Sequence, residues 1–180
     1  MLMDADKSCL VVIDIQTKLN PVMFDEGRAP QGAAKLLLGA DILNVPAIVT
    51  EQYSKGVGPT VDDLQDFMPE GSPLEKDTFS CCGNEEFMSR LKATGAKQAI
   101  LCGIEAHICV LQTALRLLEE GYEVFVVEDA TASRKPENHR AGLERIRQNG
   151  GQVVVVESVL FEWLKKSGTA EFKQISQLIK

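Results

Sequence analysis

One cysteine of the chain occupies a position that suits nucleophilic chemistry. Cys109 follows the apolar run 99–103 and falls in the first turns of a predicted helix. Unpaired backbone N–H groups and the helix dipole favour a thiolate there, and the same N–H groups can bind an oxyanion during acyl transfer. A cysteine is also often a small core residue. Cys109 is therefore a candidate nucleophile, with a role in the core as the alternative.

Two ionisable residues elsewhere in the chain are candidates to assist a thiol. Asp14 ends the apolar run 9–13. Burial raises the pKa of a carboxyl group and makes it a better general base, although an acid in this place can also simply turn the chain. Lys76 lies between Glu75 and Asp77, and such a lysine is ordinarily a solvated surface charge. Its residue type alone gives Lys76 no catalytic role.

The remaining chemically active residues leave alternatives open. Cys81 and Cys82 are adjacent, and adjacent cysteines form only a strained disulfide and lack Cys-x-x-Cys spacing. His107, two residues before Cys109, either tunes the thiol or lines a pocket, or is a satisfied turn histidine. Gln16 and Phe24 follow the run 9–13.

Two aromatic residues complete the set expected to line a substrate pocket. Tyr53 and Phe79 stand at either end of the long irregular region 52–79, which is rich in glycine and proline. Loops of this length inside a compact domain are often functional. The region follows a predicted strand, so it lies at the edge where an open parallel sheet binds its ligand.

The elements that position these residues alternate between strand and helix. Continuous apolar runs, typical of strands covered on both faces, occupy residues 9–13, 46–50, 99–103, 124–127 and 153–156. Helical periodicity occupies residues 33–44, 85–94, 107–120 and 136–149. This order predicts a single domain over 1–180 with an α/β fold, a three-layer α/β/α sandwich around a mainly parallel, Rossmann-like sheet. Two helical stretches in residues 159–180 are expected at its edge or against another subunit, with residues 159–164 as the contact surface.

Composition excludes several classes of protein. The 180 residues carry a formal net charge of -7 and no dense run of Lys and Arg, so nucleic acid is not an expected partner. No apolar stretch is long enough to cross a bilayer, and the acidic start is unlike a secretory signal. Five scattered cysteines indicate free thiols in a reducing compartment. A cytoplasmic enzyme is predicted.

Four segments together resemble the isochorismatase-like hydrolases. Residues 103–114 resemble that superfamily's nucleophile motif, a glycine-led turn followed by Cys-Val and Thr-Ala. Residues 11–16 are similar to its opening strand, with an acid and a following Gln, and residues 75–80 match its lysine segment. Residues 127–134 resemble its late Asp-Ala-x-x-Ser motif. The similarity runs in the family's order, and the segment from Thr50 to Thr60 looks most like the isochorismatase domain-containing branch.

The resemblance implies a catalytic triad of Asp14, Lys76 and Cys109. Asp14 takes the thiol proton, Lys76 holds the thiolate by its charge, and Cys109 attacks a carbonyl carbon, which needs no histidine. The resemblance also implies a non-proline cis peptide at Ile104–Glu105 and an oxyanion hole formed by the N–H groups of Glu105 and Cys109. A homo-oligomer is expected as well.

The sequence departs from the metal-dependent members of the superfamily. Nicotinamidases bind a metal through an Asp-x-His cluster, whereas this chain has Glu51-Gln52-Tyr53 there and only two histidines. No metal and no cofactor are expected. The first prediction is a metal-independent cysteine hydrolase of a small amide, imide or related carbonyl compound, with amide cleavage preferred to enol-ether cleavage. A catalytically idle binding or assembly module and a thiol-based redox protein are the alternatives.

Overall fold

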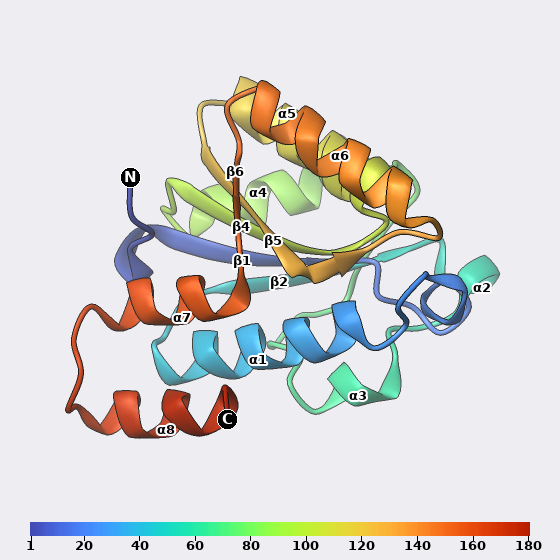
Figure 1. Ribbon diagram of the computed structural model, residues 1–180. Coiled ribbons are helices and arrows are strands. Elements are labelled where there is room, and N and C mark those ends of the chain that lie inside the picture. The colour runs from blue at the N-terminus through green and yellow to red at the C-terminus, as the bar shows by residue number, and fades with distance from the viewer.

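Six strands form one parallel sheet in the order β3-β2-β1-β4-β5-β6. The computed structural model describes residues 1–180, and Figure 1 shows the sheet between two layers of helices. The strands are β1 (Ser8–Ile13), β2 (Ala47–Gln52), β3 (Leu74–Lys76), β4 (Gln98–Ile104), β5 (Glu123–Ala132) and β6 (Gln152–Val154). The predicted α/β/α sandwich with a parallel sheet is confirmed.

The two faces of the sheet are covered by different helices (Figure 1). One core lies under α1 (Arg28–Ile42), α7 (Val156–Leu164) and α8 (Ala170–Leu178). The other lies under α4 (Glu85–Ala93), α5 (Leu111–Glu119) and α6 (Pro136–Gln148). Alternate residues of β1 enter alternate cores, and the whole strand is buried. Burial on both faces explains why the sequence of this strand is apolar from Cys9 to Ile13.

Short helical turns occupy several connections. Two single-turn helices, α2 (Ser54–Val57) and α3 (Asp62–Gln65), lie in the irregular region between β2 and β3. Three-residue turns occur at η1 (Ala5–Lys7), η2 (Asn20–Val22) and η3 (Cys81–Gly83), and a π turn, η4 (Ala106–Val110), leads into α5. No helix has both the length and the apolar character required to cross a membrane.

The strand order reverses direction between β1 and β4. The chain runs outward from β1 to β2 and β3, and then returns to the other side of β1 to form β4. Open parallel sheets bind ligands beyond the carboxyl ends of the strands at such a reversal. Gly103 stands here with φ +118°, and a Cβ atom on it would overlap the backbone oxygen of Ile13. Only glycine permits this close approach of β4 to β1.

The structure corrects three sequence expectations about elements. The region 52–79 contains a sixth strand, β3. The sequence does not predict it, because the strand has only three residues and only one of them is apolar. The expected last strand, 153–156, ends at Val154, because Val156 already begins α7. The expected helix 107–120 begins as the π turn η4, and only its later part is α-helical.

The C-terminal segment does not offer the contact surface expected from its sequence. Four of its apolar side chains, Val159, Leu160, Trp163 and Leu164, are buried in the chain's own core. Only Phe161 stays partly exposed. The segment is apolar because α7 and α8 cover the sheet and α1, so its composition does not by itself indicate a subunit interface.

Candidate active site

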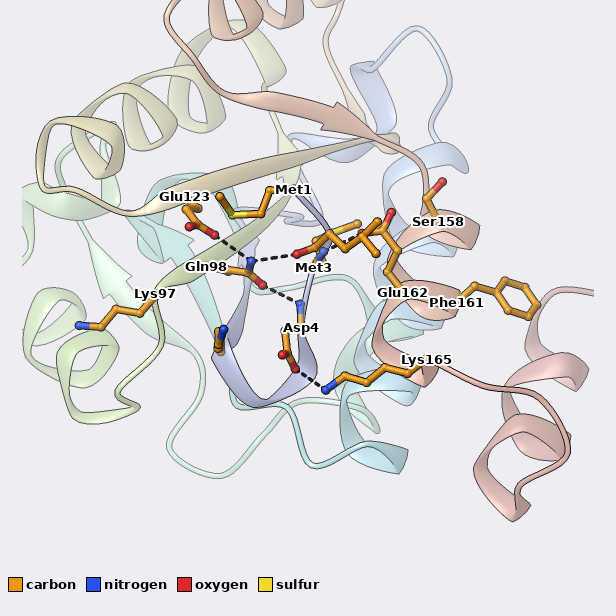
Figure 2. A pocket seen from close by; sticks show the side chains of 12 residues that line it. Met1, Met3, Asp4, Lys97, Gln98, Glu123, Ser158, Phe161, Glu162 and Lys165 are labelled. Carbon is orange, nitrogen blue, oxygen red and sulfur yellow. Dashed lines mark hydrogen bonds and ion pairs between the residues drawn. The ribbon is translucent and has the colours of Figure 1, made fainter.

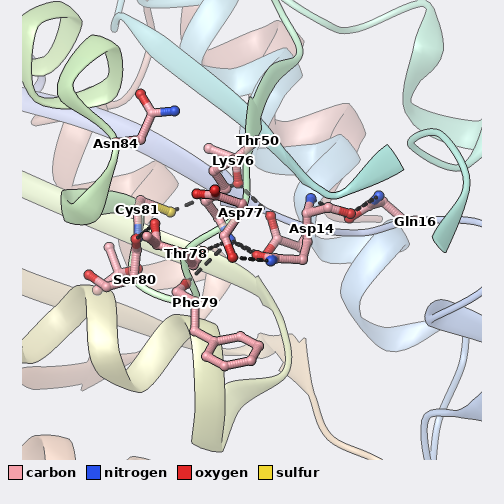
Figure 3. Close-up of polar contacts among 12 residues, drawn as sticks. Asp14, Gln16, Thr50, Lys76, Asp77, Thr78, Phe79, Ser80, Cys81 and Asn84 are labelled. Atoms are coloured by element: carbon pink, nitrogen blue, oxygen red, sulfur yellow. Dashed lines mark hydrogen bonds and ion pairs between the residues drawn. The ribbon is translucent and has the colours of Figure 1, made fainter. Parts of the chain in front are cut away.

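Asp14 lies at the reversal point, directly after β1. Its backbone adopts the left-handed conformation at φ +54°, which aspartate tolerates better than most residues. Its side chain is fully buried. One carboxylate oxygen, Oδ2, lies 2.7 Å from Lys76 Nζ, and the other accepts a hydrogen bond of 2.7 Å from Thr50 Oγ1 (Figure 3). Both oxygens are therefore held by donors from neighbouring strands.

Lys76 is the last residue of β3, and its side chain is 1% exposed. Besides Asp14, its ammonium donates to Gln52 Oε1 at 2.6 Å and to the backbone oxygens of Thr78 and Phe79 at 3.1 and 3.3 Å (Figure 3). One carboxylate and three neutral oxygens thus surround a buried cation. Lys76 is not the surface charge that its acidic neighbours suggest.

The pKa values of the pair follow from burial and mutual attraction. Burial raises the pKa of Asp14, while Lys76 and the Thr50 hydroxyl oppose this rise. Burial by itself would lower the pKa of Lys76, but the nearby acidic groups, Asp14 first, raise it. Lys76 therefore remains charged, and Asp14 is a stronger base than an exposed carboxylate.

Cys109 lies on η4, 7% exposed, where both charged groups act on it. Burial raises the pKa of its thiol above the ordinary value, and the Asp14 carboxylate raises it further by charge and hydrogen bonding. Lys76 opposes this rise with a smaller effect. The resting thiol is therefore protonated. The resting protein therefore differs from the expectation of a thiolate at a helix start, because burial and Asp14 raise the pKa of the thiol more than Lys76 lowers it.

A second thiol adjoins the pair. Cys81 is completely buried, and its Sγ lies 3.9 Å from Thr50 Oγ1. Burial, reinforced by Asp14, raises its pKa to about 12. Cys82 is half-buried, and burial raises its pKa to about 11. All five cysteines are free, so the Cys81–Cys82 pair forms no bridge.

The turn before Cys109 is tied to the loop after β5. The Ile104–Glu105 peptide bond is cis, at the position that the sequence resemblance implies. The Glu105 carboxylate is buried and accepts hydrogen bonds from the backbone N–H and the Nε of Arg134, at 3.0 to 3.2 Å. Sequence reasoning did not single out Arg134, because only the fold brings residues 105 and 134 together.

Gln16 does not line a pocket, contrary to expectation. Its side chain is fully buried, and its Oε1 accepts from the Gln52 backbone N–H at 2.7 Å. Its Nε2 donates to the backbone oxygens of Gln52 and Gly58 at 3.0 and 2.6 Å. Gln16 therefore joins the end of β1 to the end of β2 and leaves no polar atom for a ligand.

Three other residues expected to line the pocket, Tyr53, Phe79 and His107, differ in their surroundings. Tyr53 and Phe79 are 59% and 56% exposed and follow the two strands that carry Gln52 and Lys76. In Figure 3 the ring of Phe79 points away from the charged cluster. His107 lies on η4, with Nδ1 3.0 Å from Ser133 Oγ and Nε2 3.4 Å from Asn138 Nδ2.

Phe24 belongs to a neighbouring part of the surface. Its ring meets His139 edge-on, with ring centroids 5.6 Å apart. Its backbone N–H donates to the Ser133 oxygen at 3.0 Å. Ser133 thus contacts both residues, Phe24 through its backbone oxygen and His107 through its hydroxyl.

Thr50 and Gln52 are two contact residues that sequence reasoning missed. Thr50 faces Asp14 because β1 and β2 pair in register at Ile13 and Thr50. Gln52 faces Lys76 because β2 and β3 pair in register at these two residues. Each contact depends on how two strands pair, so these two residues can be identified only when the register of the sheet is known.

The main clefts of the surface lie away from this cluster. Five clefts of about 210 to 740 Å³ are lined by other residues than Asp14, Lys76 and Cys109. The largest lies at the amino-terminal edge of the sheet, where Asp4 pairs with Lys165 and Gln98 donates to Glu123 (Figure 2). Cys109, which is 7% exposed, lines none of these five clefts.

No group of three or more His, Cys, Asp or Glu side chains is arranged to hold a metal ion. Gln52 lies in the segment that corresponds to the metal-binding cluster of nicotinamidases, and its side-chain oxygen Oε1 already accepts a hydrogen bond from the Lys76 ammonium. A fixed cation beside this oxygen disfavours a second cation at the same place.

Comparison with protein families gives a match to the isochorismatase domain over residues 8–158. Among curated relatives, the isochorismatase domain-containing protein 2 of Danio rerio is 41% identical over 174 residues, covering 96% of this chain and 86% of the relative.

Solved structures agree with this match. The MAR1 ribonuclease of Caenorhabditis elegans superposes with a TM-score of 0.93 at 34% identity, covering 99% of this chain and 92% of that chain. The YcaC gene product of Escherichia coli, described as an octameric hydrolase of unknown specificity, gives a TM-score of 0.92 at 26% identity and covers 99% and 90%.

Proposed function

The chain belongs to the isochorismatase-domain family, and we propose that it is a metal-independent cysteine hydrolase of a small amide, imide or related carbonyl compound. The nucleophile is Cys109, assisted by Asp14 and Lys76. One observation carries this proposal: a fully buried carboxylate and ammonium, 2.7 Å apart, lie beside a thiol at the reversal point of the sheet. A buried ion pair is a weak source of stability, so its presence beside a thiol favours a chemical role.

The first step is transfer of the thiol proton to Asp14. Burial raises the basicity of this carboxylate, which makes it able to accept a proton from Cys109. The transfer leaves the carboxyl neutral, so Lys76 then faces the new thiolate as its only nearby counter-charge. A cation beside a thiolate stabilises it.

The thiolate then attacks the carbonyl carbon of the substrate. The carbonyl oxygen gains the negative charge, and the backbone N–H groups of Glu105 and Cys109 are proposed to receive it. The tetrahedral intermediate collapses to a thioester as the carbon–nitrogen bond breaks, and protonated Asp14 returns its proton to the leaving nitrogen. Water, deprotonated by Asp14, hydrolyses the thioester and restores the thiol.

Access to Cys109 limits the kind of substrate. The sulfur-bearing side chain is 7% exposed and lines none of the five main clefts. Either a small substrate enters or the region between β2 and β3 shifts. The exposed rings of Tyr53 and Phe79 at this edge are proposed to contact the substrate or a second copy of the chain. A homo-oligomer remains part of the proposal, supported by the octameric state given for the Escherichia coli neighbour.

The alternatives predict different substrates and different cysteines. A structural neighbour is named a ribonuclease, but the formal net charge of -7 on this chain disfavours binding to a phosphate backbone. A redox protein would use Cys109 or the Cys81–Cys82 pair, and within that pair Cys81 has no exposed surface. A catalytically idle module would show no turnover at all. The cytoplasmic location expected from the sequence also stays a prediction.

Turnover by matched cysteine variants tests the proposal. Wild type, Cys109→Ala and Cys82→Ala are assayed on a panel of small amides, imides and esters, with an RNA substrate in parallel. We expect Cys109→Ala to lose at least about a thousandfold in kcat, while Cys82→Ala keeps its activity. Equal rates for wild type and Cys109→Ala would refute the nucleophile. Turnover of RNA alone would favour the ribonuclease alternative.

A further inference from the structure

A small cleft lies beyond the outer edge of β5, and its lining includes none of Asp14, Lys76 and Cys109. Strand β6 pairs with β5 only through Val127, although β5 continues to Ala132. The cleft beside the uncovered part of this edge is lined by Arg28, the first residue of α1, and by residues of α6 from Pro136 to Arg147. Arg28 Nε donates to the Glu128 backbone oxygen at 3.3 Å. The resulting cleft has a volume of about 210 Å³.

The lining of this cleft is positively charged in an acidic protein. Three guanidinium groups, from Arg28, Arg140 and Arg147, face one carboxylate, from Glu128. The local charge is therefore +2 (three positive and one negative), against a formal net charge of -7 for the chain. Arg140 and Arg147 are seven positions apart on α6 and so share one face of the helix.

Two of the three guanidinium groups have no carboxylate partner. Arg147 lies 3.6 Å from Glu128 Oε2 and also pairs with Glu144. Arg28 contacts only the backbone oxygen of Glu128, and the side chain of Arg140 makes neither a hydrogen bond nor an ion pair. Arginines that lack a carboxylate partner and line one cleft from two helices are suited to an anion, because a guanidinium fork matches phosphate oxygens in pairs.

The floor of the cleft is neutral and partly aromatic. His139 is buried, with Nε2 3.0 Å from Thr131 Oγ1. Burial and then the charge of Arg28 lower the pKa of His139, so the positive charge comes from the arginines. The ring of Phe24 lies edge-on to His139 and is partly exposed at the rim. It offers an apolar surface to the group that carries an anion.

We propose that this cleft binds the phosphate group of a small phosphorylated compound, whose apolar part rests against Phe24. Arg140 and Arg28 hold the phosphate oxygens. The cleft shares no residue with the Asp14, Lys76 and Cys109 cluster, so the proposal stands independently of the hydrolase function.

Calorimetric titration at low ionic strength tests the proposal with two probes, inorganic phosphate and phenyl phosphate. The variants are Arg140→Gln and, as a matched control, Arg145→Gln, which removes the same charge from an exposed position on the same helix outside the cleft. We expect Arg140→Gln to weaken phosphate binding about tenfold, or about 1.4 kcal/mol, while Arg145→Gln has little effect. Circular dichroism checks that both variants fold.

The second probe examines the aromatic rim. Phenyl phosphate is expected to bind more tightly than inorganic phosphate, and Phe24→Ala is expected to remove that advantage while phosphate still binds. Absence of saturable phosphate binding by wild type would overturn the site. Equal weakening by Arg140→Gln and Arg145→Gln would reduce it to general electrostatic attraction and overturn it too. Equal affinity for both probes would overturn the role of Phe24.

Discussion

Replacement of Lys76 by methionine removes one partner of the buried ion pair while keeping a side chain of similar length. The Nζ atom lies 2.7 Å from Asp14 Oδ2, and the two side chains are 1% and 0% exposed. Breaking a buried pair by removing one partner costs about 3–5 kcal/mol, because it leaves an uncompensated buried charge. For a chain of this size, such a loss lowers Tm by about 6–20 °C.

The deficit of Lys76→Met should depend on pH through Asp14. Burial already raises the folded-state pKa of Asp14, and Lys76 opposes this rise, so the variant raises it further. An acid whose folded-state pKa exceeds its unfolded value of about 3.9 contributes stability at low pH, and loses it as the pH rises through the folded-state pKa. The stability difference from wild type should therefore shrink as the pH falls toward that value.

Urea unfolding at several pH values measures both effects. Lys55→Met is the matched control, since Lys55 on α2 is exposed and should change stability by less than about 0.5 kcal/mol. The double variant Asp14→Asn with Lys76→Met removes both charges and should recover part of the loss. A loss for Lys76→Met no larger than that for Lys55→Met would refute the reasoning, as would a double variant whose loss equals the sum of the single losses.

Three further predictions concern the thiol and the turn that carries it. The rate of alkylation of Cys109 by iodoacetamide, followed by peptide mapping, should rise with pH through neutrality without levelling off, because burial raises the pKa of the thiol. Lys76→Met should lower this rate, because it removes the charge that opposes the rise in pKa. A plateau of the rate below neutral pH would contradict this. In urea unfolding, Gly103→Ala should cost about 3 kcal/mol or more, because a Cβ overlaps the backbone of β1, whereas Gly121→Ala, at φ +86° with nothing within 4 Å, should cost about 1 kcal/mol. Glu105→Ala should lower kcat by about 10- to 100-fold with a smaller effect on KM, because its carboxylate fixes the turn before the nucleophile; an unchanged kcat would contradict that positioning role.

The long strands could be predicted because burial on both faces leaves a strong signal in the sequence. β1 and β4 have no exposed residue, and each is a continuous apolar run after a polar first residue, Ser8 or Gln98. β3 has only three residues and one of them is exposed, and a segment this short has no period to detect. Lys76 is nevertheless its last residue, so the strand with the weakest signal in the sequence carries the lysine of the candidate site.

Contacts of the candidate site were predictable only in part. The resemblance pointed to Asp14, Lys76 and Cys109, and the structure brings the first two into contact. Gln52 and Thr50 escaped notice because a polar residue near the end of a strand is common, and its partner depends on the register of the neighbouring strand. The position of Gln16 shortly after Asp14 predicts contact with the substrate, but its side-chain amide instead makes hydrogen bonds to backbone groups of residues 52 and 58.

The protonated resting state of Cys109 follows from the pairing of the two charges beside it. Burial has the largest effect and raises the pKa of the thiol. The Asp14 carboxylate raises this pKa further, and its effect exceeds the lowering by the Lys76 ammonium. In the proposed mechanism, transfer of the proton to Asp14 changes the partners, because the carboxyl would become neutral and Lys76 would then pair with the thiolate. The buried region contains one positive and one negative charge before and after the transfer. Activation therefore requires no additional charge to be desolvated, which is the main cost of forming a thiolate in a buried place.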